Sequence, residues 1–412
     1  MRILLLNQVF YPDVVSTAQH LADLAAALVE RGHAVTVVSS RRAYEHPETV
    51  FPARETWRGV EIIRVYSTRF GKTARWRRAA DFGSFLLASC LRLGFLPRHD
   101  VVVALTTPPL ISFLGAWRAL FWRARFVYWV MDFNPDEAVA AGWLRAGSVT
   151  ARFLERISLF SLRRADEIIA LDRFMRDRIV SKQIPAAKVS VIPPWSHDLQ
   201  VAFDPAGRRE FRAAHGLEDK FVVMYSGNHS PVHPLETLMQ AAEQLRAEKD
   251  LVFAFIGGGS QFRRVRAWAS QNPNTLCLPY QPLNRLSGSL SAADAHGVIM
   301  GDAMLGLVHP SKIYNILAVG APVIYIGPEP SHITELLSGL KSRHPWVGVR
   351  HGAVGELVRK LQALREESAA WDRRPPAEVQ TQFSHAALLP RLMNLIESPA
   401  HPGLQSAPAR CG

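Results

Sequence analysis

The sequence predicts an α/β protein built from two domains in tandem, each with a parallel sheet. Short apolar strands alternate with amphipathic helices along almost the whole chain, which is typical of βαβ units. The 412 residues exceed the usual size of one hydrophobic core. A polar, turn-rich segment at 196–207 interrupts the alternation near the middle of the chain. We therefore expect an N-terminal domain at 1–198 and a second domain at 199–380.

The N-terminal half opens with a βαβ unit. Residues 2–6 and 34–39 have the pattern of short buried strands, and a helix is expected between them at 18–30. Ligands bind beyond the carboxyl ends of the strands in such sheets, so we expect Ser16 and Thr17 at a cleft. The later elements expected in this half are strands at 61–65, 101–105, 126–130, 167–170 and 189–192, and a long helix at 149–163.

Three carboxylates follow directly after the strand expected at 126–130, in the run Asp-Phe-Asn-Pro-Asp-Glu at 132–137. Carboxylates at the carboxyl end of a strand are well placed to orient a substrate or to transfer protons. Asp132 is therefore a candidate catalytic residue. Two interpretations of Asp136 stay open, a side chain in the cleft or a cap of the next helix, because Asp commonly caps helices.

The second half repeats the alternation and ends in a helix. We expect residues 381–397 to form a terminal helix that packs back on the N-terminal domain, and residues 398–412 to form a flexible tail. The elements expected before that helix are strands at 221–225, 252–256, 275–278, 297–300 and 322–326, and helices at 234–247, 262–270, 286–293 and 354–366.

Three loops of the second half follow strands, and each has the composition of a ligand-binding loop. They lie at 226–234, at 257–259 and at 309–312, and the first and third lead into helix N-termini. Glycines such as Gly227 permit close backbone approach, free N–H groups at a helix N-terminus attract anions, and Lys312 adds a positive charge. Together the three loops predict a site for a nucleotide diphosphate.

A metal site is not expected in the first of these loops. His229 and His233 are four residues apart, but Pro231 argues against a helix, and no Glu accompanies them as in His-Glu-x-x-His. We expect these histidines to bond phosphate, while a structural role remains an alternative. The chain also lacks the motifs of P-loop NTPases and α/β-hydrolases, and no dinucleotide-binding fingerprint follows the first strand.

The charge of the chain favours a phosphate-rich partner. The formal net charge is +12, and residues 54–98 hold ten basic and three acidic side chains. No nucleic-acid-binding module is recognisable, so we expect an anionic membrane surface and no nucleic acid; an ordinary solvated surface is the alternative. The segment from Arg75 to Phe85, basic and aromatic, would rest on a bilayer.

No part of the sequence predicts a membrane span or a disulfide framework. The apolar segments at 82–96 and 101–122 are interrupted by arginine or proline, and the first apolar run is too short for a signal peptide. Three cysteines lie far apart in the chain. We therefore expect a cytoplasmic protein at the inner face of the plasma membrane.

The chain resembles the GT-B glycosyltransferases, and is most similar to family 4 enzymes that build bacterial surface polysaccharides. The similar segments are 7–38, 129–142, 191–198, 225–242 and 310–324. The resemblance implies two Rossmann-like domains with parallel sheets facing across a cleft. It also implies a nucleotide-sugar donor in the C-terminal domain, an acceptor in the N-terminal domain, transfer with retention, and neither a metal nor another cofactor.

The resemblance also assigns roles to residues by position. Lys312 and the start of its helix would meet the donor phosphates, with Asp132 near the sugar or the acceptor and with Ser16 and Thr17 across the cleft. The other donor-binding candidates are Gly227, Asn228, His229, His233, Gly257, Gly258, Leu278, Tyr280, Pro310, Ser311 and Asn315, while Asp136 is a candidate on the acceptor side.

Two positions depart from the family pattern. Family 4 members often carry two glutamates eight positions apart, and Leu307 and Asn315 stand there in this chain. Asn315 can still bond a ribose hydroxyl, but without charge. We expect a hexosyl- or N-acetylhexosaminyltransferase acting on a lipid-linked or polysaccharide acceptor. A nucleotide-sugar epimerase of the same fold and a noncatalytic nucleotide-sugar-binding protein remain alternatives.

Overall fold

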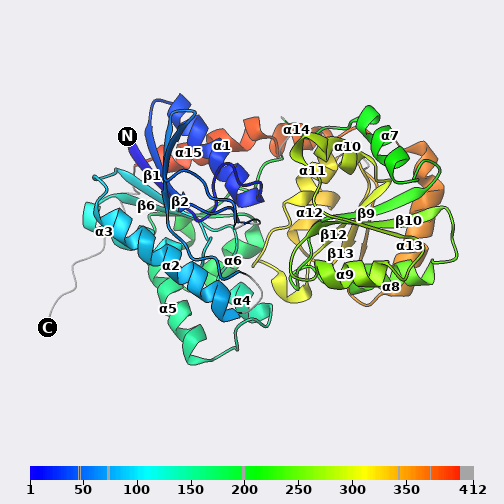
Figure 1. The fold of residues 1–412 in the computed structure, drawn as a ribbon, viewed down its shortest axis with the longest axis horizontal. Helices are drawn as coiled ribbons and strands as arrows, with labels where there is room; N and C mark the ends of the chain where they lie inside the picture. Colours follow the sequence, from blue (N-terminus) through cyan, green and yellow to red (C-terminus); the bar gives the residue numbers. More distant parts are fainter. Residues whose placement is uncertain are drawn as a thin grey trace.

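The computed structural model describes residues 1–44, 46, 48–71, 75–196, 200–341, 344–371 and 373–399. Two parallel-sheet domains lie side by side, with the N-terminal one coloured blue to green and the C-terminal one green to orange (Figure 1). The expected α/β class is therefore confirmed. The boundary placed after residue 198 and most of the expected tail, from residue 400, lie outside the described residues.

The N-terminal sheet is mostly parallel and buried. β1 pairs with β2 and β5 through the apolar residues at 3–6, which are fully buried, because helices cover both faces of the sheet. An antiparallel edge strand, β3, was not predicted, since its run Arg-Glu-Thr-Trp is polar and half exposed. The spatial order is β3 (Arg54–Trp57), β4 (Val60–Val65), β2 (Ala34–Ser40), β1 (Arg2–Leu6), β5 (Val101–Ala104), β6 (Arg125–Trp129), β7 (Glu167–Ala170) and β8 (Val189–Val191).

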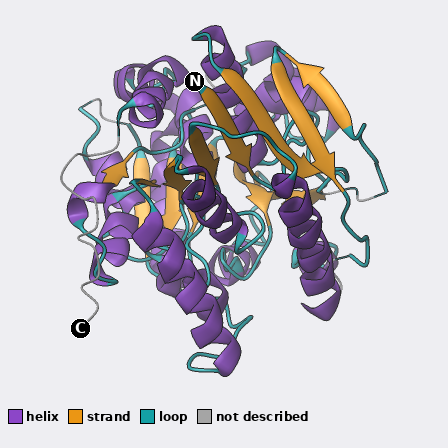
Figure 2. Cartoon of the chain, turned by 90° about the vertical axis from the view of Figure 1, so that its left-hand side faces the viewer, coloured by secondary structure: helices purple, strands orange, loops and turns teal. Residues whose placement is uncertain are grey.

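The helices of this domain connect successive strands. Their bounds follow the predicted periodicity where it is long, while short helices such as α6 gave too weak a pattern to be predicted. Two long helices project from the sheet in Figure 2. The helices are α1 (Ser16–Glu30), α2 (Arg75–Gly94), α3 (Ile111–Trp122), α4 (Asp136–Ala140), α5 (Val149–Arg164) and α6 (Arg173–Ser181), with the 3₁₀ turn Ala186–Lys188.

The C-terminal sheet is fully parallel. Two neighbouring strands run further than expected, to Asn228 and Gly258, because Gly227 and Gly257 near their ends pair in register without side chains that would separate them. The order is β11 (Thr275–Leu278), β10 (Leu251–Gly258), β9 (Phe221–Asn228), β12 (Ala295–Ile299), β13 (Val323–Ile326) and β14 (Trp346–Val349).

Helices flank this sheet as well. Figure 1 shows α8, α9 and α13 towards one side of it and α10, α11 and α12 towards the other. The helices are α7 (Pro205–Ala214), α8 (Glu236–Gln244), α9 (Phe262–Ala269), α10 (Leu286–Ser291), α11 (Lys312–Ala318), α12 (His332–Ser338), α13 (Val354–Glu366), α14 (Ala377–Gln382) and α15 (His385–Glu397), with 3₁₀ turns at Leu283–Arg285, Asp302–Met304 and Glu367–Ala370.

The last helix, α15, lies against the N-terminal domain (Figure 1). Glu397 pairs with Arg31 at 2.6 Å and with His33 at 2.8 Å, and Arg125 donates to the carbonyl of Ile396. The chain therefore crosses between the domains twice. The N–H of Ser196, on the first crossing, donates to the carbonyl of Phe383 near the second one.

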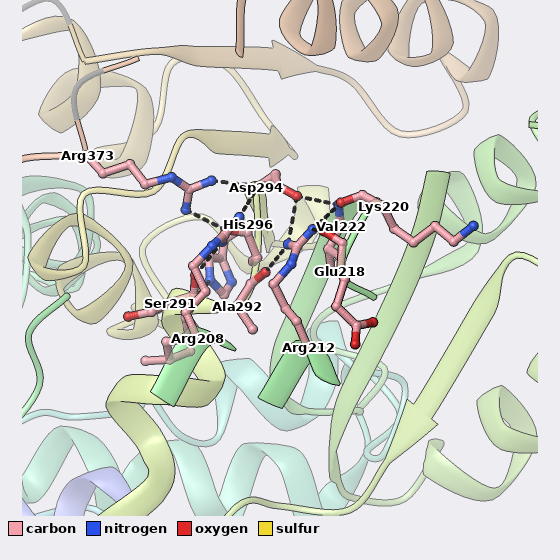
Figure 3. Close-up of polar contacts among 12 residues, drawn as sticks. Arg208, Arg212, Glu218, Lys220, Val222, Ser291, Ala292, Asp294, His296 and Arg373 are labelled. Carbon is pink, nitrogen blue, oxygen red and sulfur yellow. Dashed lines mark hydrogen bonds and ion pairs between the residues drawn. The ribbon is translucent and has the colours of Figure 1, made fainter. Parts of the chain in front are cut away.

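Arginines near both crossings meet at Asp294, just before β12 (Figure 3). Arg208 on α7 donates to this carboxylate at 2.7 Å, Arg373 beyond α13 at 2.6 Å, and Arg212 at 3.1 Å. The same guanidinium groups donate to the carbonyls of Ser291 and the two residues after it, at the end of α10. Asp294 directly precedes β12. The arginine cluster therefore lies at the amino-terminal ends of the strands, opposite the loops that follow them.

Candidate active site

Lys312, the first residue of α11, holds its ammonium group over the end of β9. Its Nζ atom lies 3.7 Å from the centre of the Tyr225 ring, and a Cβ atom on Gly227 would come within 2.6 Å of it. The Nζ atom is buried and has no hydrogen-bond partner in the part of the chain that the structure describes. Burial lowers the pKa of Lys312 to about 7. No described carboxylate forms an ion pair with this cation, and an anion reaching it would supply a counter-charge.

The glycines of the first two loops lie against each other. Gly257 is opposite Gly227 in the paired strands, and a Cβ atom on Gly257 would lie 2.0 Å from the carbonyl oxygen of Gly227. Both residues have φ near +140°, a conformation that side chains disfavour. A Cβ atom on Gly258 would lie 2.8 Å from the Tyr280 ring. Only glycine therefore permits the backbone of these loops to come so close to Lys312 and Tyr280.

The two histidines of the first loop are held by backbone carbonyls. Nδ1 of His229 lies 3.0 Å from the carbonyl oxygen of Gly227, and Nδ1 of His233 lies 2.8 Å from that of Ile299. Burial, followed by the charge of Lys312, lowers their pKa values to about 4 and about 3, so both rings are neutral at pH 7. In this arrangement the two histidines shape the loop, and the protonated form of Lys312 is the positively charged group beside it.

The N-terminal domain directly contacts the segment that precedes α11. The hydroxyl of Ser16, at the start of α1, lies 3.3 Å from that of Ser311, just before α11. The N–H of Phe133, after β6, donates to the carbonyl of Leu307 at 2.8 Å. The structure therefore brings Ser16, the neighbour of Thr17, and the loop that holds Asp132 together with the stretch that leads to Lys312.

Two carboxylates occupy the N-terminal side of this meeting point. Burial raises the pKa of Asp132 to about 6. Burial, and then the charge of Asp132, raises the pKa of Glu137 to about 8, while Asn134 donates to its carboxylate at 3.1 Å. Both side chains nevertheless keep part of their surface exposed. A half-buried carboxyl pair that changes protonation near neutral pH is suited to accepting or donating a proton.

Other candidate residues have different surroundings. Asp136 pairs at 3.0 Å with Lys182, the residue that follows α6, so its carboxylate connects α4 with the end of α6. Leu307 is buried in the core, and its backbone carbonyl accepts the N–H of Phe133 from the other domain. Asn315 is half-buried one turn after Lys312 on α11. The remaining donor candidates, at strand or helix ends, are Asn228, Leu278 and Pro310.

Sequence reasoning missed two residues of this site. Tyr225 lies in an apolar strand, where an aromatic residue gives no signal of its own beyond packing. Glu137 was visible in the acidic run at 132–137, but the sequence does not say which carboxylate lies beside Asp132. Asp136 turned towards Lys182, and Glu137 towards Asn134, because the α4 turn places consecutive side chains on different faces.

Comparison with known proteins assigns the fold to a family. Residues 17–195 match the family described as "Glycosyl transferase 4-like domain". The chain is 24% identical over 383 residues to WcaI of Escherichia coli (strain K12), named as a colanic acid biosynthesis glycosyl transferase, with 83% of this chain and 91% of WcaI covered. Residues 17–195 belong to the glycosyl transferase 4-like family, and the two-domain fold is that of GT-B glycosyltransferases. The recognition made from the sequence is thus confirmed.

Two further proteins are similar to this glycosyltransferase. WbjE of Pseudomonas aeruginosa, named as a glycosyltransferase, is 23% identical over 338 residues, covering 82% of this chain and 83% of its own. The crystal structure of Anabaena HepE in complex with UDP-glucose superposes with a TM-score of 0.72 at 15% identity, covering 97% of this chain and all of that one. This likeness shows that the GT-B fold extends over both domains.

Proposed function

We propose that the protein transfers a sugar, with retention of anomeric configuration, from a nucleotide-diphosphate sugar to a lipid-linked or polysaccharide acceptor in cell-surface polysaccharide biosynthesis. The observation that carries this proposal is the buried ammonium group of Lys312 beside Gly227, which has no hydrogen-bond partner among the described residues. The names of WcaI, as a colanic acid biosynthesis enzyme, and of the HepE complex, with UDP-glucose, support the pathway class and the donor class.

A diphosphate suits the surroundings of Lys312. The ammonium group is desolvated and touches the face of Tyr225, a contact that stabilises a cation only partly. Phosphate oxygens would add a full counter-charge and charge-assisted hydrogen bonds. Negative charge grows on the diphosphate as the anomeric C–O bond breaks, so Lys312 would stabilise the transition state more than the bound donor. We propose that the reaction needs no metal for this reason.

The acceptor would lie on the N-terminal side, beside Asp132 and Glu137. A small cavity borders Asn134 and Ala138, near these carboxylates in the sequence, and is lined by hydroxyl and apolar groups from the segments after β5 and β6 and from α5. In the transfer, the acceptor oxygen bonds to the anomeric carbon as the bond to the diphosphate breaks, and the acceptor proton must leave. An ionised Asp132 would orient the acceptor hydroxyl and favour loss of that proton.

We further propose that the acceptor is reached at an anionic membrane surface. Among the described residues no helix combines the length and apolarity of a membrane span. Three neighbouring helices of the N-terminal domain nevertheless expose large apolar side chains near arginines, which is typical of surfaces that rest on a bilayer. The exposed residues are Trp76, Leu87 and Leu91 on α2, Phe95 after it, Phe121 on α3, and Val149 and Phe153 on α5.

The donor is tested first by ligand-induced stabilisation. We would screen UDP-, GDP-, dTDP- and ADP-sugars for a rise in unfolding temperature, because a ligand that binds only the native state stabilises it. The best donor is then incubated with membrane lipid extracts, and the anomeric configuration of the product is read by NMR. Transfer with retention would support the proposal.

The alternatives give different results in the same experiment. An epimerase would convert the free donor without any acceptor. A noncatalytic binding protein would be stabilised by a nucleotide sugar yet leave it unchanged. If no nucleotide sugar raised the unfolding temperature, the donor site around Lys312 would be wrong.

A further inference from the structure

Three side chains that the transfer reaction does not use meet where the two domains touch. Asp172 caps the N-terminus of α6 in the N-terminal domain. His309 lies in the loop before α11, and His332 is the first residue of α12, both in the C-terminal domain. The three side chains are 7%, 2% and 6% exposed. A carboxylate and two imidazoles are thus buried together between segments far apart in the sequence.

Their potential ligand atoms converge on one point. Oδ2 of Asp172 lies 2.9 Å from Nδ1 of His309 and 3.4 Å from Nδ1 of His332. The ligand atoms of the three residues all lie within 4.8 Å of one another. The two imidazole rings stack with their centres 4.1 Å apart. Ligands of a tetrahedral Zn²⁺ ion, each about 2.0–2.2 Å from the metal, are separated by comparable distances.

The ring nitrogens of His332 are available to bind a ligand. Neither ring nitrogen of His332 makes a hydrogen bond to any residue that the structure describes, although both atoms are buried. A buried polar group without a partner costs free energy, so such groups are rare in native proteins. A cation bound by one of these nitrogens would remove that cost.

The remaining bonds of the cluster resemble the outer contacts of known metal sites. Nε2 of His309 lies 2.9 Å from the hydroxyl of Tyr314, which can fix the ring while Nδ1 faces Asp172. The N–H of Met175 donates to Oδ1 of Asp172 at 2.8 Å and leaves Oδ2 for the cluster. Metal-binding histidines and carboxylates are commonly oriented by a second hydrogen bond of this kind.

We propose that Asp172, His309 and His332 bind a divalent transition-metal ion, with Zn²⁺ as the best match. Imidazole nitrogen and carboxylate oxygen suit Zn²⁺, and three protein ligands leave a fourth position for water. Small rotations of the stacked rings would point both nitrogens at the ion.

The ion would connect the two domains. Asp172 belongs to one domain and both histidines to the other, and Arg173 pairs with Glu335 beside the cluster. His309 also lies three residues before Lys312. A bound ion would therefore hold the domains in contact and fix the loop that leads to α11. This role is independent of the proposed transfer, since it concerns metal affinity and stability and requires no donor.

Metal binding is measured on the full chain after treatment with a chelator. Zn²⁺ alone is titrated in a calorimeter, and its effect on the unfolding temperature is compared with that of Mg²⁺. Co²⁺, which reports tetrahedral coordination by visible absorption, serves as a spectroscopic probe. We expect one Zn²⁺ per chain, a rise in unfolding temperature with Zn²⁺ but not Mg²⁺, and Co²⁺ absorption of the tetrahedral type.

Variants locate the ion. His332→Ala should lose the high-affinity binding and the Zn²⁺-induced stabilisation, whereas the control His215→Ala, which replaces a half-buried histidine outside the cluster, should keep both. Tyr314→Phe removes only the outer contact and should weaken Zn²⁺ binding roughly 10- to 100-fold. Absence of Zn²⁺ binding by the wild-type chain would overturn the proposal whether or not the variants fold. Equal binding by wild type and folded His332→Ala would overturn it as well.

Discussion

The ammonium group of Lys312 lies 3.7 Å from the centre of the Tyr225 ring, and Tyr225 belongs to a strand 87 positions earlier in the chain. The aromatic face is the nearest compensation for a cation whose pKa burial has lowered to about 7. The ligand-free site is therefore electrostatically unfavourable, and binding of a diphosphate would relieve it. Removal of the ammonium group is therefore expected to weaken donor binding but to stabilise the ligand-free protein.

Lys312→Met should weaken binding of the nucleotide-sugar donor by about 10- to 100-fold, because a hydrogen bond to a charged group contributes about 1.5–3 kcal/mol. The same change should stabilise the ligand-free protein below pH 7. A lysine whose folded pKa is lowered destabilises the fold most at low pH, and this effect disappears as the pH rises towards 10.5. Calorimetric titration and thermal unfolding measure the two effects, and unchanged donor affinity would refute the phosphate assignment.

The transfer rate should fall on the acidic side of pH 6. Burial raises the pKa of Asp132 to about 6, so the carboxylate that would orient the acceptor hydroxyl is lost by protonation below that value. We expect kcat/KM to decrease about tenfold per pH unit there. Asp132→Asn should lower the rate by about 100-fold or more and remove the acidic limb. A variant with an unaltered pH profile would show that Asp132 is not the titrating group.

Glu137→Gln should stabilise the protein increasingly as the pH rises. Burial and the charge of Asp132 raise the pKa of Glu137 from 4.5 to about 8, so the folded state holds this proton more tightly than the unfolded state. The wild type therefore loses stability between pH 4.5 and pH 8, and the glutamine variant does not. Urea unfolding at pH 4 and pH 8 measures the difference, which should be near zero at pH 4; a constant difference would contradict the raised pKa.

Gly306 controls the contact between the domains. It has φ of +71°, and a Cβ atom there would lie 2.6 Å from the carbonyl oxygen of Phe174 in the other domain. Gly306→Ala should therefore separate the domains and increase the radius of gyration measured by small-angle scattering. Gly352→Ala is the matched control, because Gly352 has φ of +82° with nothing within 4 Å. Backbone strain should lower the free energy of unfolding of both variants by about 1–2 kcal/mol, but only Gly306→Ala should increase the radius of gyration.

The exposed apolar surface of the N-terminal domain should bind anionic vesicles. Phe95 is 82% exposed and Trp76 is 62% exposed. Binding to vesicles with phosphatidylglycerol should weaken as salt rises, because arginine contributes through screened attraction. The double variant with Phe95→Ser and Trp76→Ser should bind vesicles more weakly than the wild type. Val50→Ser, at an exposed site of another surface segment, should bind them as the wild type does. Equal binding of all three proteins in a flotation assay would argue against membrane docking by this face.

Much of the fold was predictable because the pattern of apolar residues is long and regular. The helix expected at 354–366 has those bounds in the structure, and strands at 2–6 and 275–278 were likewise correct. The elements that were missed are short or polar, such as β3 and α6, and their stability comes from the neighbours on which they pack. The longer ends of β9 and β10 depend on the pairing of Gly227 with Gly257, which is a contact between strands.

The sequence by itself determined two parallel α/β domains, the three loops that follow strands of the second domain, and Lys312 as the cation among them. The tertiary structure decided which side chains meet. It placed Tyr225 beneath Lys312, set Glu137 rather than Asp136 beside Asp132, and joined Asp172 to His309 and His332 across the domain contact. The physical reason is that periodicity along a chain reports burial of one face of an element, whereas contacts between residues far apart depend on the packing of whole elements.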